Sequence, residues 1–290
     1  MKKLSGKILI LFTFMAAALF LFSCGDKPAA EETPETPAYT ITAPDGKEGT
    51  ITISEDGKTI TLQPEETDVK YTITGEFEGQ IINKTKGTVI ILDNAKLTNA
   101  NGKAAIYGEL KTEIKFEKDS TNIIAVTGDA DKTYGKAAIL CEKAIEIGGA
   151  GTCTISCENG HGVKASKIEL KGSGNYTFDG GDDSSGINCN SFTVENDSEG
   201  NPRTFTAIFK DSKNGIKADE TIEIECGTFE FKNITGTALK TDKKDNEGAE
   251  PKDHFIHLTG GTFTFADDCA AKYETKKDCF EIADAVNGNF

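Results

Sequence analysis

Apolar and polar residues alternate along most of this chain in short segments, which is typical of strands with one buried face. A small residue followed by an aliphatic one precedes each group of segments, and we call these pairs anchors. The anchors are Ala105-Ile106, Ala138-Ile139, Gly162-Val163, Gly186-Ile187, Gly215-Ile216, Ala238-Leu239 and, more weakly, Ala270-Ala271. Their spacings of 33, 24, 24, 29, 23 and 32 residues indicate a unit of 23 or 24 residues with insertions. Such a period is typical of solenoids.

Two alternating segments follow most anchors. The first has apolar positions at Ile114/Phe116, Ile145/Ile147, Ile168/Leu170, Phe192/Val194, Ile222/Ile224 and Ile256/Leu258. The second has them at Cys153/Ile155, Tyr176/Phe178, Phe229/Phe231 and Phe263/Phe265. Gly, Asn and Asp separate the segments, and no segment has a helical period. The pattern predicts an all-β protein, a right-handed parallel β-helix whose coils of about 23–24 residues stack their apolar residues into internal ladders.

The N-terminus has the pattern of an export signal. Three lysines precede an apolar run from Ile8 to Phe22, which is short for a membrane span and ends next to Cys24. It resembles a bacterial lipoprotein signal, which implies that residues 1–23 are a signal peptide and that Cys24 becomes the acylated, palmitate-bearing first residue. The alternative is an uncleaved anchor helix. Either predicts a protein tethered in the bacterial cell envelope, at the outer membrane or the cell surface.

The remaining chain divides into a tether and one domain. Residues 24–38 are rich in Pro, Ala and Glu and lack a core pattern, which predicts a flexible tether behind the lipidated cysteine. Alternating segments such as Thr59-Ile60-Thr61-Leu62 begin soon afterwards. We therefore expect residues 39–290 to form a single β-helix domain with an N-terminal cap, and to be monomeric.

The charge of the chain limits its partners. The formal net charge is −15, and removing residues 1–23 deletes three lysines and no acids, giving −15 − 3 = −18. Arg203 is the only arginine. Because phosphate recognition depends on clusters of arginine and lysine, nucleic-acid binding is disfavoured. An acidic protein also repels anionic polymers unless a cation bridges the two.

Several short sequence motifs of this chain occur together in a known group of proteins. Residues 71–75 (Tyr-Thr-Ile-Thr-Gly), 102–106 (Gly-Lys-Ala-Ala-Ile), 215–219 (Gly-Ile-Lys-Ala-Asp) and 260–265 (Gly-Gly-Thr-Phe-Thr-Phe) resemble bacterial β-helix proteins of the carbohydrate-binding-domain-containing family. The resemblance covers about residues 70–275. It implies binding of a cell-wall or extracellular polysaccharide, including acidic pectic chains, with calcium as a helper.

Lysines supply the first candidate binding site. Lys164, Lys217, Lys240 and Lys272 each occur two residues after the start of an anchor, so we expect them to form an outward row, interrupted at Asn188. Such a row suits the carboxylates or hydroxyls of a linear polymer. The alternative is that outward lysines only protect a long sheet from aggregation.

Acidic turns supply a candidate calcium site. Asp179, Asp182 and Asp183 precede one anchor and Asp211 precedes the next, so their carboxylates are expected to converge from adjacent coils. Calcium prefers such oxygen ligands. The alternative is that aspartates are simply suited to tight corners. A bound calcium ion would also allow this acidic protein to hold an acidic glycan.

An enzyme and an adhesive protein are the alternatives to a binding module. His161 and the Asp182-Asp183 pair superficially resemble motifs of pectin-cleaving hydrolases, where paired carboxylates activate water, but they occur in the reverse order. A lyase would need a base such as Lys217. We therefore predict no catalytic residue. A structural or adhesive lipoprotein that binds another protein is the third interpretation.

The cysteine positions predict buried thiols. Cys153 aligns with the inward residues Tyr176 and Phe229, and most other cysteines are likewise expected to act as small apolar residues. No zinc-finger spacing is present. Cys269 and Cys279 are the pair to test for a disulfide.

Overall fold

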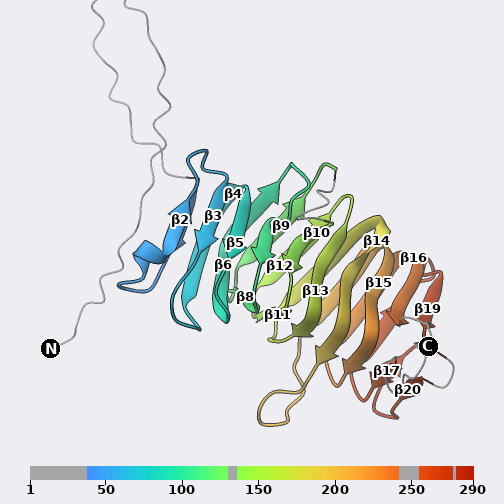
Figure 1. The fold of residues 1–290 in the computed structure, drawn as a ribbon. Coiled ribbons are helices and arrows are strands. Elements are labelled where there is room, and N and C mark those ends of the chain that lie inside the picture. The colour runs from blue at the N-terminus through green and yellow to red at the C-terminus, as the bar shows by residue number, and fades with distance from the viewer. Residues whose placement is uncertain (1–37, 130–135, 242–254, 277–278) are drawn as a thin grey trace, which may run out of the picture.

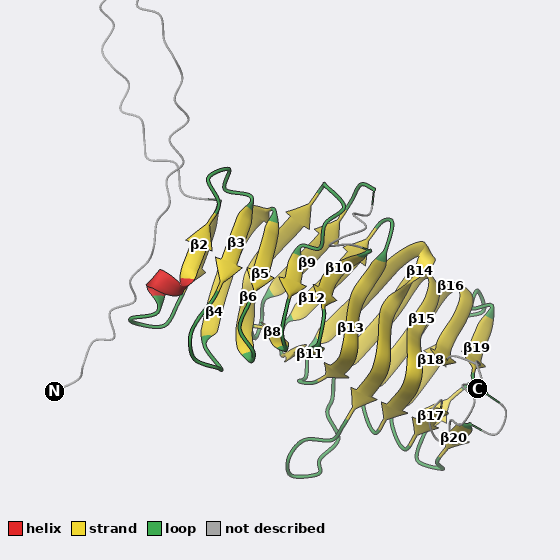
Figure 2. Cartoon of the chain, in the orientation of Figure 1, coloured by secondary structure: helices red, strands yellow, loops and turns green. Residues whose placement is uncertain are grey.

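The computed structural model describes residues 38–129, 136–241, 255–276 and 279–290. These residues form strands that stack from the N-terminal to the C-terminal end of the domain, with one short helical turn, η1 (Glu48–Thr50) (Figures 1 and 2). The all-β prediction is confirmed. No helix in this described part of the chain has the length and hydropathy needed to cross a bilayer.

The strands lie on three sides of the core, and we name the sides by the order in which the chain visits them. The anchor side carries β3 (Thr59–Leu62), β5 (Gln80–Asn83), β7 (Ile106–Gly108), β10 (Ala137–Cys141) and β19 (Ala271–Glu274). The second side carries β8 (Thr112–Phe116), β11 (Ala144–Gly149), β17 (Phe255–Leu258) and β20 (Phe280–Ile282). The third side carries β9 (Thr121–Val126), β12 (Thr152–Cys157), β18 (Thr262–Phe265) and β21 (Asn287–Gly288).

Six longer strands bend from one side to the next. They are β4 (Lys70–Glu78), β6 (Thr88–Asn99), β13 (His161–Leu170), β14 (Asn175–Val194), β15 (Thr206–Ile224) and β16 (Thr228–Thr241). Thus β6 pairs with β8 on the second side and β9 on the third, and β13 pairs with β10 on the anchor side and β11 on the second. β14 and β15 pair along all three sides. In the part of the chain that the structure describes, the bends join the three sides into one 21-stranded sheet around a single core.

This continuity corrects the predicted fold class. The prediction of an open right-handed parallel β-helix with regular coils is wrong, because the sheet is closed around the core, as in a barrel, and is not entirely parallel. β1 (Tyr39–Thr42) and β2 (Ile51–Ile53) pair antiparallel with β4 and β3 at the N-terminal end. The closure has a local cause. Asp211 and Asn233 adopt φ near 50°, so the strand turns the corner without losing its ladder.

The core consists of side chains that stack from one turn of chain to the next. Phe178, Phe209, Phe231 and Phe265 are buried, and their successive ring centroids lie 5.0, 5.1 and 5.2 Å apart. They come from equivalent positions in β14, β15, β16 and β18. Since alternate residues of each strand point inward, the residues between them face solvent and form equally regular outer rows.

Candidate functional site

Three of the four predicted lysines form a row on the anchor side. Lys164 of β13 pairs with Asn188 of β14, Asn188 with Lys217 of β15, and Lys217 with Lys240 of β16. We call these four residues the lysine row. Each is half-buried and lies between inward residues, which directs it outward. Because adjacent strands are about 4.8 Å apart, the row presents closely spaced hydrogen-bond donors along the sheet.

The fourth predicted lysine lies elsewhere. Leu239 pairs with Tyr273, so Glu274, and not Lys272, continues the row beside Lys240. The Lys240 ammonium is 3.0 Å from the Glu274 carboxylate. Lys272 instead lies over the Phe265 ring, 5.9 Å from its centroid. The weak anchor at Ala270-Ala271 had placed this last strand two residues out of register.

A second row of polar residues lies beside the lysine row. Ser185, Asn214 and Thr237 are buried and occupy equivalent positions in β14, β15 and β16. Asn214 Nδ2 donates to Ser185 Oγ (3.3 Å), and the Thr237 N–H donates to Asn214 Oδ1 (3.3 Å). Thr237 Oγ1 in turn bonds to the Glu274 carboxylate (3.1 Å). These bonds satisfy the buried groups and fix the strands that carry the lysines.

His161 ends this polar row. Its Nδ1 accepts a hydrogen bond from the Ser185 N–H (3.0 Å), so the ring proton belongs on Nε2. Burial, together with the positive charges of Lys164 and Lys217, lowers the pKa of His161 to about 4. The imidazole is therefore neutral near pH 7. This half-buried imidazole therefore serves as a neutral hydrogen-bond acceptor at the start of β13.

The charges around the lysine row are only partly neutralised. Lys217 lies 3.5 Å from Asp219, and Lys240 is paired with Glu274. Lys164 forms no ion pair with any of the described residues. The row thus keeps positive charge on an otherwise acidic molecule, which allows it to attract an anionic ligand locally.

The structure brings only some of the aspartates of the acidic turns close to one another. Lys210 lies between Asp179 and Asp211, with its ammonium 3.5 Å from the first and 2.6 Å from the second. The Lys210 ammonium and a hydrogen bond from Asn233 lower the pKa of Asp211. Asp182 and Asp183 are exposed at the bend of β14. Among the described residues, no group of three or more His, Cys, Asp or Glu side chains is placed to hold a metal ion.

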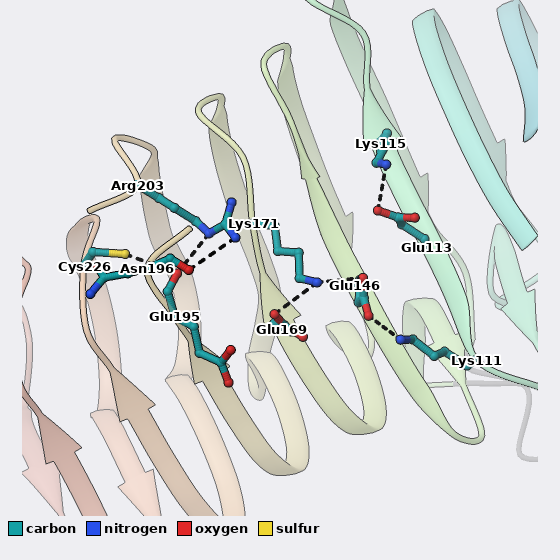
Figure 3. Close-up of polar contacts among 10 residues, drawn as sticks. All are labelled: Lys111, Glu113, Lys115, Glu146, Glu169, Lys171, Glu195, Asn196, Arg203 and Cys226. Carbon is teal, nitrogen blue, oxygen red and sulfur yellow. Dashed lines mark hydrogen bonds and ion pairs between the residues drawn. The ribbon is translucent and has the colours of Figure 1, made fainter. Parts of the chain in front are cut away.

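Sequence reasoning missed a row of glutamates on the second side. Glu113, Glu146 and Glu169 occupy equivalent outward positions in β8, β11 and β13. Lys171 bonds to Glu146 (2.9 Å) and lies 3.2 Å from Glu169, while Lys111 contacts Glu146 from the other side (Figure 3). The signal was present, because the residue between the two apolar positions is glutamate both at 146 and at 169.

Two lysines favour the ionised form of Glu146. Burial raises the pKa of Glu146, but hydrogen bonds from Lys111 and Lys171 outweigh burial and leave the pKa below its usual value. A cleft of about 310 Å³ adjoins the row and is lined by Thr67, Asp68, Lys86, Gly87, Lys111, Glu113 and Glu146. Because the lysine and glutamate charges neutralise each other, this network stabilises the stacked strands.

The thiols are placed as predicted for structural residues. Cys141, Cys153, Cys157, Cys189 and Cys226 are buried free thiols, and Cys269 is a half-buried one. Cys269 therefore forms no disulfide with Cys279. Burial raises the pKa of Cys157 to about 11, so the thiol stays protonated and unreactive. The predicted signal peptide, the predicted lipidation site Cys24 and the predicted tether up to residue 37 lie outside the described residues.

Comparison with known proteins identifies the family. The model of the carbohydrate-binding domain-containing protein family matches residues 47–200, which is 154 of the 290 residues. The chain belongs to this family. The matched part contains the glutamate row, Lys164 and Asn188, whereas Lys217 and Lys240 lie beyond it.

One solved structure has a similar fold. It is described as the polysaccharide lyase-like protein from C. thermocellum, as a gadolinium derivative. The TM-score is 0.51 at 18% sequence identity, and the match covers 83% of this chain and 93% of that one. At this identity the likeness concerns the fold alone. No curated protein matches the chain.

Proposed function

We propose that this protein binds polysaccharide along the lysine row, and that acidic glycans are its preferred ligands. One observation carries the proposal: Lys164, Asn188, Lys217 and Lys240 stand in register on four adjacent strands of the anchor side. Membership of the carbohydrate-binding family supports the ligand class. A linear polyuronate carries a carboxylate on every sugar, and regularly spaced ammonium groups can pair with several of them at once.

Replacing two lysines tests this site. We expect Lys217→Gln/Lys240→Gln to weaken binding of polygalacturonate at least tenfold at low salt, because two charge-assisted contacts are lost. The binding that remains should also depend less on salt. Calorimetric titration of the chain from residue 24, carrying Cys24→Ser, measures the affinity. Lys118→Gln/Lys232→Gln is the matched control, since both of these lysines are exposed and lie outside the row. Equal losses in the two double variants would show that only net charge matters.

We also propose that calcium assists glycan binding, and the same titration tests this separately. The exposed carboxylates of Asp182 and Asp183 are the groups with which a calcium ion would bridge protein and uronate, next to Asp179 and Asp211. Polygalacturonate is titrated with calcium and with chelator, and Asp182→Asn/Asp183→Asn is compared with the parent. Binding that is the same under all these conditions would remove calcium from the proposal and leave the lysine row intact.

We also propose that Cys24 carries a lipid that tethers the domain to the bacterial envelope. The apolar run that ends next to Cys24 supports this, and the following tether would leave the domain free to reach a polymer. The full-length chain expressed in a bacterium is expected to partition into the detergent phase of a cloud-point extraction, and Cys24→Ser to move it to the aqueous phase. A Cys24→Ser variant that stays in the detergent phase would favour the uncleaved anchor helix.

A further inference from the structure

A groove of about 510 Å³ lies where the chain turns from the second side to the third side near the C-terminal end. One wall is a row of residues at equivalent positions in β15, β16, β18 and β21. These are Thr206, Thr228, Thr262 and Asn287. The other wall includes Asn196 and Arg203 from the long connection between β14 and β15, together with Glu225. Three intervals of about 4.8 Å give this row a length of roughly 14 Å.

The connection that forms the second wall is held in place by its own hydrogen bonds. The Arg203 Nε–H donates to the Glu195 carbonyl (2.9 Å), and Arg203 Nη2 donates to the Asn196 carbonyl (3.4 Å) (Figure 3). The Asn196 N–H donates to the Glu225 carboxylate (3.0 Å). Because both ends of the wall are bonded, the groove is preorganised and needs little ordering to bind a ligand.

Several polar atoms along the groove have no partner within the described residues. Asn196 Oδ1 is buried and accepts no hydrogen bond. The hydroxyl groups of Thr206, Thr228 and Thr262 also make none. The threonine residues are at least partly exposed and line the groove, so a ligand hydroxyl can bond to their free hydroxyl groups. Arg203 uses only part of its five N–H donors on the backbone, so it has donors left for a ligand.

The lining identifies the chemistry of that ligand. Arg203 and Glu225 are the two charged residues of the lining, and their charges cancel. The remaining polar groups are hydroxyls, amides and glycine backbone, which both donate and accept hydrogen bonds. The groove therefore does not favour a polyanion, because the charge of its one cation, Arg203, is balanced by the Glu225 carboxylate. An uncharged molecule with many hydroxyls matches the groove, and the volume suits a small ligand.

We propose that this groove binds an uncharged oligosaccharide, with its long axis along the row of threonines. The hydroxyls of Thr228 and Thr262 bond to sugar hydroxyls, and Arg203 donates to the same oligosaccharide. This inference rests on the proposed function, polysaccharide binding, and adds a second site of different chemistry at a different place on the sheet. One molecule thereby holds a neutral and an acidic polymer at once.

The test removes hydroxyl groups without changing the shape of the groove. The chain from residue 24 with Cys24→Ser is titrated with cellohexaose and with xylohexaose. Whichever of these two hexasaccharides binds the parent protein, we expect Thr228→Val/Thr262→Val to weaken its binding by at least tenfold, since two hydrogen bonds are lost. Thr121→Val/Thr152→Val is the matched control, because these threonines occupy the same row on β9 and β12 but lie outside the groove. The control should bind as the parent does.

The single arginine of the chain provides an independent readout. The Nε–H resonance of Arg203 is the only one of its kind in a ¹⁵N-labelled sample, and it should shift on addition of the bound hexasaccharide. Lys217→Gln/Lys240→Gln should leave both affinity and shift unchanged, so loss of the lysine row and loss of the groove are told apart. Binding of neither hexasaccharide, or an unmoved Arg203 signal, or equal effects of the two threonine pairs, would overturn the inference whatever polygalacturonate does.

Discussion

Replacing Phe231 with alanine is expected to lower the free energy of unfolding by about 4 kcal/mol. Phe231 is completely buried and stacks between Phe209 and Phe265, at 5.1 and 5.2 Å between ring centroids. The ring also packs so closely on Gly215 that a Cβ added there would lie 2.5 Å from Phe231 Cε1. Removing the ring opens a cavity between two turns of chain that cannot close without shifting both strands.

Denaturation by guanidinium measures this loss. Lys232→Ala is the control, because Lys232 is the next residue of β16 and is exposed, so its loss should change the free energy of unfolding by no more than about 0.5 kcal/mol. A loss below about 1 kcal/mol in Phe231→Ala would mean that the aromatic stack does not hold adjacent turns together. The lysine row would then depend on the hydrogen bonds of its buried polar neighbours.

The sequence was sufficient to find the inner positions of the sheet. Strict alternation marked Phe229, Phe231, Phe263 and Phe265 as inward, and all four are buried. The same alternation brought Lys164, Lys217 and Lys240 onto one outer row. Period-two patterning therefore carries information about both faces of a strand wherever the core on one side is continuous.

Closure of the sheet could not be read from the sequence. Asp and Asn at a corner are equally compatible with a turn that ends a strand and with a bend that continues it. The outcome depends on a single φ angle, as at Asp211 and Asn233, where the ladder persists through the corner. The predicted register of the last turn of chain was wrong for a related reason. Ala270 and Ala271 are too weak an apolar signal to distinguish the true register, which places Tyr273 opposite Leu239.

The groove could not be predicted from the sequence either, because its second wall is not part of the regular strand pattern. The connection from Glu195 to Phe205 is much longer than the equivalent turn around Cys226 and Gly227. Length alone does not reveal that Arg203 folds back onto the Glu195 and Asn196 carbonyls. The Gly-Thr pairs at Gly227-Thr228 and Gly261-Thr262 were visible in the sequence, but only the structure shows that their hydroxyls have no hydrogen-bond partner among the described residues.

His161 is expected to make the stability of the protein depend on pH between about 4 and 6.5. The folded-state pKa is about 4, whereas an unfolded histidine titrates near 6.5. In this window the unfolded chain binds a proton that the folded chain does not, so the free energy of unfolding rises with pH. The difference of about 2.5 pKa units corresponds to about 3 kcal/mol, which is gained in full above pH 6.5 and lost below pH 4.

The variant His161→Asn isolates this contribution, because the amide oxygen can accept the Ser185 N–H in place of Nδ1 and does not titrate. Guanidinium unfolding of the two proteins at a series of pH values should show free energies of unfolding that diverge as the pH rises from 4 to 6.5 and then stay parallel. Curves that are parallel throughout would show that neither burial nor the charges of Lys164 and Lys217 lower the pKa of the ring. Divergence would instead show that burial, with a smaller contribution from the positive charges of Lys164 and Lys217, keeps the ring neutral in the folded protein.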